Sequence, residues 1–219
     1  FHVKPSHAIA ALDGARNGRV VEGCVGGGTG MIGYGWKGGI GTASRRLAPV
    51  AGGYTLGVLV QLNCGRRSEL VIAGVPVARA LASEPKYSAS RELGSIIIVA
   101  ATDAPLLPHQ LKRIARRLTM GLARTGSVSG NGSGDLFLAF SSANPPERSR
   151  TEKRAHVIDV PMLRNSQIDP LFTAAVQATE EAIVNALIAA DSMSGIDGHV
   201  IAALPHDRIR KIFLSRGTD

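Results

Sequence analysis

The sequence is poor in cysteine and aromatic residues. It has two cysteines, Cys24 and Cys64, which exclude a disulfide-rich scaffold or a multi-cysteine zinc site. The six histidines show no metal-ligand spacing, so no metal or other cofactor is expected. With 4% aromatic residues and no stacking motif, the net charge of +8 does not indicate a nucleic-acid partner. One basic cluster lies on the polar side of a predicted amphipathic helix and includes Lys112, Arg113, Arg116 and Arg117.

Long apolar runs are also missing. No stretch approaches the roughly 18 to 20 residues that cross a bilayer, so we expect no membrane partner. The sequence begins at Phe1, without a methionine, shortly before a predicted helix at 6–15. We therefore expect further residues upstream, and the sequence leaves the compartment open between cytoplasm and periplasm.

Apolar residues make up 44% of the 219 positions, enough for a substantial core. Runs of predicted strands and helices without strict alternation favour an α+β layered architecture. The predicted strands cover 54–63, 69–75, 95–101, 135–142 and 199–204, and the predicted helices cover 6–15, 107–123, 167–191 and 206–215.

The run from Gly94 to Pro105 is the most informative segment. Its β-branched residues predict a strand buried on both faces, with Ser95 at the point where that strand begins. Gly94 allows another group to approach its carbonyl closely, as attack on the Gly94–Ser95 peptide bond would require. Ser95 is therefore a candidate nucleophile, and an ordinary strand start is the alternative.

Three further polar residues are candidates for the same chemistry. Asn63 ends a predicted strand, where its amide could donate to an oxyanion or merely cap the strand. Ser133 and Asp135 stand two residues apart where a glycine-rich loop enters a strand, so alternation places both on one face. The alternative for this pair is ordinary turn chemistry.

The glycine-rich region at 23–41 contains a match to G-x-G-x-x-G at Gly28–Gly33. A dinucleotide site is disfavoured, because no helix can readily follow and no acidic residue lies between Glu22 and Glu69. A glycine-dense hairpin over 29–44 is the remaining interpretation. Its basic residues make it electropositive and could favour an anionic group or an oxyanion, unless the region is only structural; they are Lys37, Arg45 and Arg46.

Five ordered motifs resemble one family, that of the L-aminopeptidase D-amidase/D-esterases and β-peptidyl aminopeptidases. They begin at Gly26, Lys37, Gly57, Gly94 and Asn131 and read GGGTGM, KGGIGTASR, GVLVQLN, GSIIIVAATDAPLLP and NGSGDLFLAF. The resemblance implies a four-layer αββα sandwich of the kind found in amino-terminal-nucleophile hydrolases. It also implies self-cleavage between Gly94 and Ser95. Residues 1–94 would then be the later part of an α segment and 95–219 the β segment, both within one structural domain.

The same resemblance implies roles for individual residues. Ser95 would be the amino-terminal nucleophile, Asn63 the oxyanion donor, and Ser133 with Asp135 the groups that orient or relay its proton. Substrates would be short peptides, amides or esters with a free amino terminus, and the αβ units would form a homo-oligomer, a tetramer by resemblance. Cys64 departs from the family, which often has an aromatic residue there.

The sequence therefore predicts a self-processing serine aminopeptidase or amidase, a hydrolase. Two alternatives stay open: acyl transfer like that of ornithine acetyltransferases, which use threonine at the junction, and a non-catalytic relative that binds a small amine or peptide. The motifs leave α- and β-amino acids, in L or D form, open as substrates.

Overall fold

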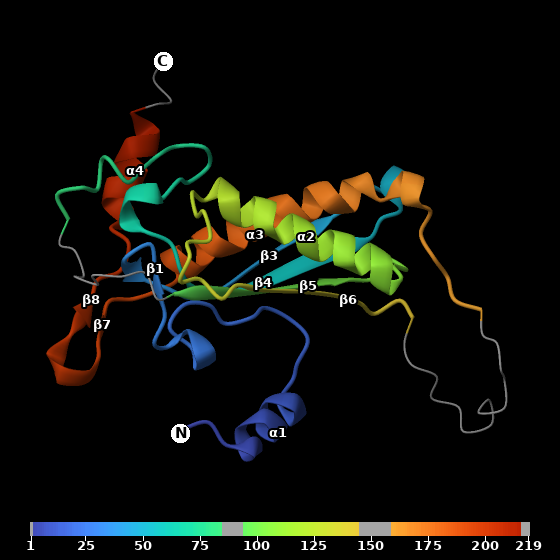
Figure 1. Ribbon diagram of the computed structural model, residues 1–219, viewed down its shortest axis with the longest axis horizontal. Helices are drawn as coiled ribbons and strands as arrows, with labels where there is room; N and C mark the ends of the chain where they lie inside the picture. The colour runs from blue at the N-terminus through green and yellow to red at the C-terminus, as the bar shows by residue number, and fades with distance from the viewer. Residues whose placement is uncertain (1, 85–93, 145–158, 216–219) are drawn as a thin grey trace.

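The computed structural model describes residues 2–84, 94–144 and 159–215 (Figure 1). Its centre is a four-stranded sheet in the order β3-β4-β5-β6. The first three strands pair antiparallel, and β5 pairs with β6 in parallel. These strands are β3 (Gly39–Arg46), β4 (Thr55–Asn63), β5 (Ser95–Thr102) and β6 (Leu136–Ser141).

Two long helices, α2 (Pro108–Arg124) and α3 (Asp169–Ile188), lie side by side over one face of this sheet (Figure 1). Helix α3 packs closely against β3 because the contact is made by small residues. A Cβ added to Gly41 of β3 would lie 2.0 Å from the carbonyl oxygen of Ala182. The strand and the helix backbone are therefore in near contact, and the core lies between the helices and the sheet.

Shorter elements lie outside the four-stranded sheet. They are the helices α1 (Pro5–Asp13) and α4 (His206–Leu214), and the strand pairs β1 (Ile32–Gly33) with β2 (Trp36–Lys37) and β7 (Met193–Ser194) with β8 (Val200–Ile201). Short 3₁₀ helices cover Gly26–Gly28, Pro49–Ala51, Arg67–Glu69, Asn165–Gln167 and Ile196–Gly198.

Most predicted elements are confirmed within one to three residues at each end, but the strand predicted at 69–75 is wrong. Its first residue ends a 3₁₀ helix, and Ala73 and Gly74 have φ angles of 47° and 78°. These left-handed residues reverse the chain, so that Ile72 bridges Val75 within the same segment. Apolar composition alone did not reveal that reversal.

The prediction that β5 is buried on both faces is also wrong for the described residues. Ile96 and Ile98 are buried beneath the helices, whereas Ile97 points to the opposite face and is 38% exposed. Its neighbours on β6 are more exposed: Leu136 (62%), Leu138 (58%) and Phe140 (49%). The described residues thus form one helix layer and one sheet layer, with an apolar sheet face turned away from the helices.

Candidate active site

The candidate nucleophile and oxyanion donor meet at the ends of two adjacent strands. Asn63, the last residue of β4, is the register partner of Ser95, the first residue of β5. Gly94 lies against the same backbone, because a Cβ added to it would be 1.9 Å from the carbonyl oxygen of Asn63. Glycine is therefore required immediately before Ser95.

The hydroxyl of Ser95 is held by the loop that precedes β6. The N–H of Gly134 donates a hydrogen bond to Ser95 Oγ over 2.9 Å. The parallel pairing of β5 and β6 brings this loop to the beginning of β5. A donor at this position stabilises negative charge that develops on Oγ when the hydroxyl loses its proton.

Asp135 connects the same loop to β5. Its Oδ1 atom accepts one hydrogen bond from Ser133 Oγ over 2.6 Å and another from the N–H of Ile96 over 3.1 Å. The carboxylate thus touches the residue that follows Ser95 and fixes the hydroxyl of Ser133. The structure brings together all four side chains that the sequence singled out: Asn63, Ser95, Ser133 and Asp135.

The side chain of Asn63 is oriented by a contact that the sequence did not reveal. Its Oδ1 atom accepts a hydrogen bond from the N–H of Ile32 over 2.9 Å. An N–H must donate to the oxygen of the amide, so this bond assigns Oδ1 and leaves Nδ2 as the outward donor. No bond to Nδ2 is made by the part of the chain that the structure describes.

Lys37 lies beneath the glycine-rich hairpin rather than on an electropositive surface, and its side chain is 2% exposed. Its ammonium donates to three backbone carbonyls, at 3.1 Å to Gly28, 2.8 Å to Met31 and 2.8 Å to Gly38. Burial lowers the pKa of Lys37 below its ordinary value, an effect that the neighbouring Cys24 opposes.

A second basic residue of the hairpin, Arg45, is also paired within the protein. Arg45 pairs with Glu181 of α3 over 2.6 Å and also donates to Gln177. The interpretation that the hairpin binds an anionic group is therefore wrong for Lys37 and Arg45, and an effect on a nearby oxyanion stays a prediction. What the glycines permit is close backbone packing: a Cβ on Gly28 would lie 2.6 Å from the carbonyl oxygen of Gly23.

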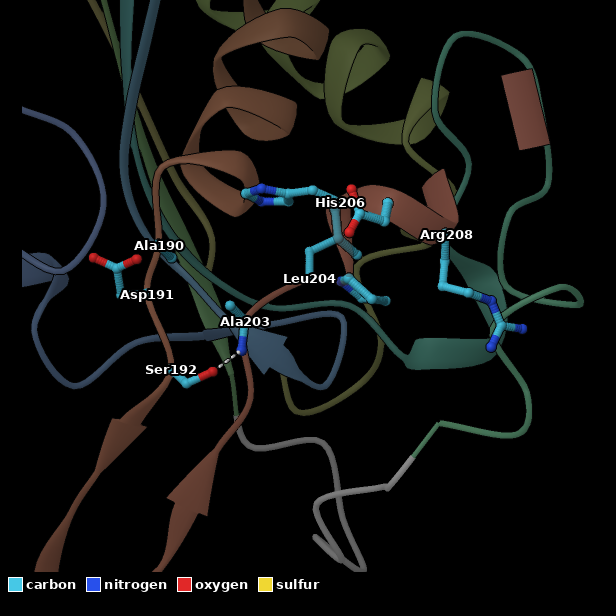
Figure 2. A pocket seen from close by; sticks show the side chains of 9 residues that line it. Ala190, Asp191, Ser192, Ala203, Leu204, His206 and Arg208 are labelled. Carbon is cyan, nitrogen blue, oxygen red and sulfur yellow. Dashed lines mark hydrogen bonds between the residues drawn. The ribbon is translucent and has the colours of Figure 1, made fainter. Parts of the chain in front are cut away.

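A separate cleft of about 600 Å³ lies between the end of α3 and the start of α4 (Figure 2). Its walls include Asp191, Ser192, Ala203 and His206, and Ser192 Oγ accepts a bond from the N–H of Ala203 over 2.9 Å. None of the four predicted site residues lines it.

Neither a metal centre nor a membrane span is found in residues 2–84, 94–144 and 159–215. No three histidine, cysteine or carboxylate side chains there are grouped to hold a metal ion. No helix within those ranges has the length and apolarity that a bilayer crossing needs.

Comparison with known proteins identifies the chain's relatives. The sequence pattern of Peptidase family S58 matches residues 1–201. The chain belongs to this family. It is 48% identical over 225 residues to the beta-peptidyl aminopeptidase BapA of Sphingosinicella microcystinivorans, and 43% identical over 222 residues to that of Sphingosinicella xenopeptidilytica. The matches cover 97% and 96% of this chain but 56% and 54% of those proteins, so it spans about half their length.

Solved structures of similar proteins agree in fold. A beta-aminopeptidase from a Burkholderia species matches 98% of this chain and 59% of its own, with a TM-score of 0.88 and 46% identity. The L-aminopeptidase D-Ala-esterase/amidase of Ochrobactrum anthropi matches 99% and 59%, with a TM-score of 0.88 and 45% identity. That protein is described as a serine aminopeptidase with a variant of the amino-terminal-nucleophile hydrolase fold. The predicted family and fold class are therefore confirmed.

Proposed function

We propose that this chain carries the catalytic centre of a self-processing serine aminopeptidase, with Ser95 as its nucleophile. The observation that carries the proposal is the arrangement of groups around Ser95. Asn63 is its register partner in the sheet, the N–H of Gly134 donates to its Oγ, and Asp135 accepts from both Ser133 and the N–H of Ile96. Such a group supplies a nucleophile, proton-handling side chains and oxyanion donors.

Processing begins when Ser95 Oγ attacks the carbonyl carbon of Gly94. The C–O bond forms, the peptide C–N bond breaks, and the hydroxyl proton passes to the nitrogen of Ser95, leaving an ester. Water then hydrolyses that ester to the carboxylate of Gly94 and the free hydroxyl of Ser95. Residues 1–94 become the end of an α segment and 95–219 the β segment of one structural domain.

Hydrolysis of substrate uses the amine that processing exposes. An α-amino group has a reference pKa of about 7.7–8.0, so much of it is neutral near neutral pH and accepts the Ser95 proton as Oγ attacks the substrate carbonyl. Nδ2 of Asn63 donates to the resulting oxyanion, and Asp135 with Ser133 holds the amine in place. The acyl-enzyme ester is then opened by water.

The substrates proposed are short peptides, amides or esters with a free amino terminus. Support comes from the relatives named beta-peptidyl aminopeptidase and L-aminopeptidase D-Ala-esterase/amidase. We also propose that the αβ units form a homo-oligomer, a tetramer, and light scattering of the intact protein tests this.

The decisive experiment replaces Ser95 in the intact protein. Ser95→Ala should leave one uncleaved polypeptide and abolish hydrolysis of amino-acid anilides, because both steps need the same hydroxyl. Intact-mass measurement reports the first and a chromogenic assay the second. Ser44→Ala, an exposed serine of β3, is the matched control and should be cleaved and active.

Two results would overturn this assignment. One is a folded wild-type protein whose Gly94–Ser95 bond stays intact, and the other is anilide hydrolysis retained by Ser95→Ala. Transfer of an acetyl group from acetyl-ornithine, without anilide hydrolysis, would instead favour the acyltransferase alternative.

A further inference from the structure

We propose that Lys37 is a positioning residue that strengthens the oxyanion donor Asn63 through the peptide bond between Met31 and Ile32. This inference rests on the proposed function, since it assigns Lys37 to the same hydrolytic step. Lys37 itself touches no reacting atom.

A single peptide unit joins the two side chains. Its carbonyl, that of Met31, accepts from Lys37 Nζ over 2.8 Å and from the N–H of Gly38 over 2.9 Å. Its N–H, that of Ile32, donates to Oδ1 of Asn63 over 2.9 Å. An unbroken hydrogen-bonded chain therefore runs from the Lys37 ammonium, through one peptide plane, to the Asn63 amide.

Hydrogen bonds in such a chain polarise one another. A cation on the Met31 carbonyl draws electron density toward its oxygen, so the Ile32 N–H becomes a stronger donor. That donor acts in turn on Oδ1 and makes Nδ2 of Asn63 the more acidic end of its amide. Nδ2 then stabilises an oxyanion better than an unassisted asparagine would.

The surroundings of Lys37 favour this role over a plain ion pair. The side chain is almost fully buried, and its ammonium donates hydrogen bonds to the carbonyls of Gly28, Met31 and Gly38. Within residues 2–84, 94–144 and 159–215 it forms no ion pair with a carboxylate. Its charge acts on these carbonyls and on the neighbouring Cys24, and burial away from water strengthens its effect on the peptide.

The test is a double-mutant cycle in the intact protein. Lys37→Met keeps the length of the side chain and removes its charge, and should lower kcat for an anilide substrate about tenfold with little change in KM. Asn63→Ala should lower kcat by roughly 10²–10³. In the Asn63→Ala background, Lys37→Met should lower kcat less than about twofold, because the donor through which it acts is gone.

A structural control separates this effect from loss of packing. Gln110→Leu also removes a fully buried polar side chain, one that donates to Leu163 and Asn165 near the opposite end of β5. It should lower thermal stability without the selective fall in kcat. Lys37→Gln, which keeps two N–H donors but no charge, replaces Lys37→Met if that variant does not fold.

A second readout does not depend on activity. In the Ser95→Ala protein, the side-chain NH₂ resonances of Asn63 should move upfield when Lys37 is replaced and stay unchanged with Gln110→Leu. Equal kcat losses in both Asn63 backgrounds, or unmoved resonances, would refute the relay while leaving Ser95 as nucleophile. Activity retained by Ser95→Ala would refute the proposed function, and the resonances would still decide the relay.

Discussion

Tyr34 is the most deeply buried ionisable side chain near the site, and it ties β1 to two other segments. Its N–H donates to the carbonyl of Cys64 over 2.9 Å, and its hydroxyl lies 2.6 Å from Thr125 Oγ1. Burial raises the pKa of Tyr34 well above its ordinary value. The phenol therefore stays protonated in the folded protein at pH values that ionise it in the unfolded chain.

This difference makes stability depend on alkaline pH. Above about pH 10 the unfolded state loses the phenol proton and the folded state keeps it, so the free energy of unfolding falls by up to about 1.4 kcal/mol per pH unit. The contribution of Tyr34 to the free energy of unfolding is complete below pH 10 and is lost as pH rises. Burial lowers the pKa of Lys37, so this residue changes the free energy of unfolding with pH in the opposite direction.

Tyr34→Phe isolates the tyrosine, because Lys37 is present in both proteins. The variant should lose about 1 kcal/mol near neutral pH, with the hydrogen bond to Thr125, and should show a shallower decline above pH 10. Urea unfolding at several pH values measures both. If the free energy of unfolding fell equally steeply above pH 10 in both proteins, Tyr34 would not be the cause of the alkaline decline.

The sequence predicted the four site side chains because each carries functional chemistry at the end of a strand or loop. It could not predict the N–H groups of Gly134 and Ile32, since every residue except proline has one. Their roles arise from segments 39 and 31 residues away meeting Ser95 and Asn63. The sequence identifies Lys37 as a cation, but the residue spacing does not indicate its burial beneath the glycines.

At the scale of elements, two strand glycines differ in what surrounds them. A Cβ on Gly41 of β3 would lie 2.0 Å from the carbonyl oxygen of Ala182 and 2.5 Å from the N of Ala186. Gly57, in the adjacent strand β4, has nothing within 4 Å of the equivalent position. Only Gly41 sets the spacing between the sheet and α3.

Alanine substitution at each glycine tests this contrast. Gly41→Ala should lower the free energy of unfolding by about 1–3 kcal/mol, because either the strand or the helix must move. Gly57→Ala should change it by less than about 1 kcal/mol. Thermal and urea unfolding compare the two, and similar losses would show that the contact with α3 does not matter.

Elements with a regular apolar period were predicted well and irregular ones were not. The helices at 107–123 and 167–191 reappear as α2 and α3, because their apolar positions recur at helical spacing. The prediction of a strand at 69–75 was wrong because Ala73 takes a left-handed conformation that its residue type does not suggest.

At the scale of the whole molecule, the sheet face opposite the helices is an exposed apolar surface of the described residues. Ile97 shares this face with the outward residues of β6, which are Leu136, Leu138 and Phe140. In a four-layer sandwich this is the face that a second sheet covers. The predicted αββα sandwich implies helices on only one face of this sheet, whereas the predicted burial of Ile97 is wrong for the described residues.

Prepared by itself, the 219-residue chain should therefore bind the dye ANS strongly in its folded state. Replacing Leu138 and Phe140 together with threonine should lower dye fluorescence severalfold. Val50→Thr, at an isolated site that is 95% exposed, serves as the control and should leave the fluorescence unchanged. Equal dye binding by all three proteins would contradict this account of the surface.

The register between β4 and β5 has a last consequence for a protein cut at Gly94–Ser95. Eight residue pairs, from Leu56 with Thr102 to Asn63 with Ser95, lie on opposite sides of that cut. They keep the two pieces together as long as the sheet is folded. Once it unfolds, the pieces diffuse apart, and recovery becomes a second-order reaction that slows with dilution. A cut at Gly94–Ser95 would thus turn one chain into two pieces that must meet again before the sheet can re-form.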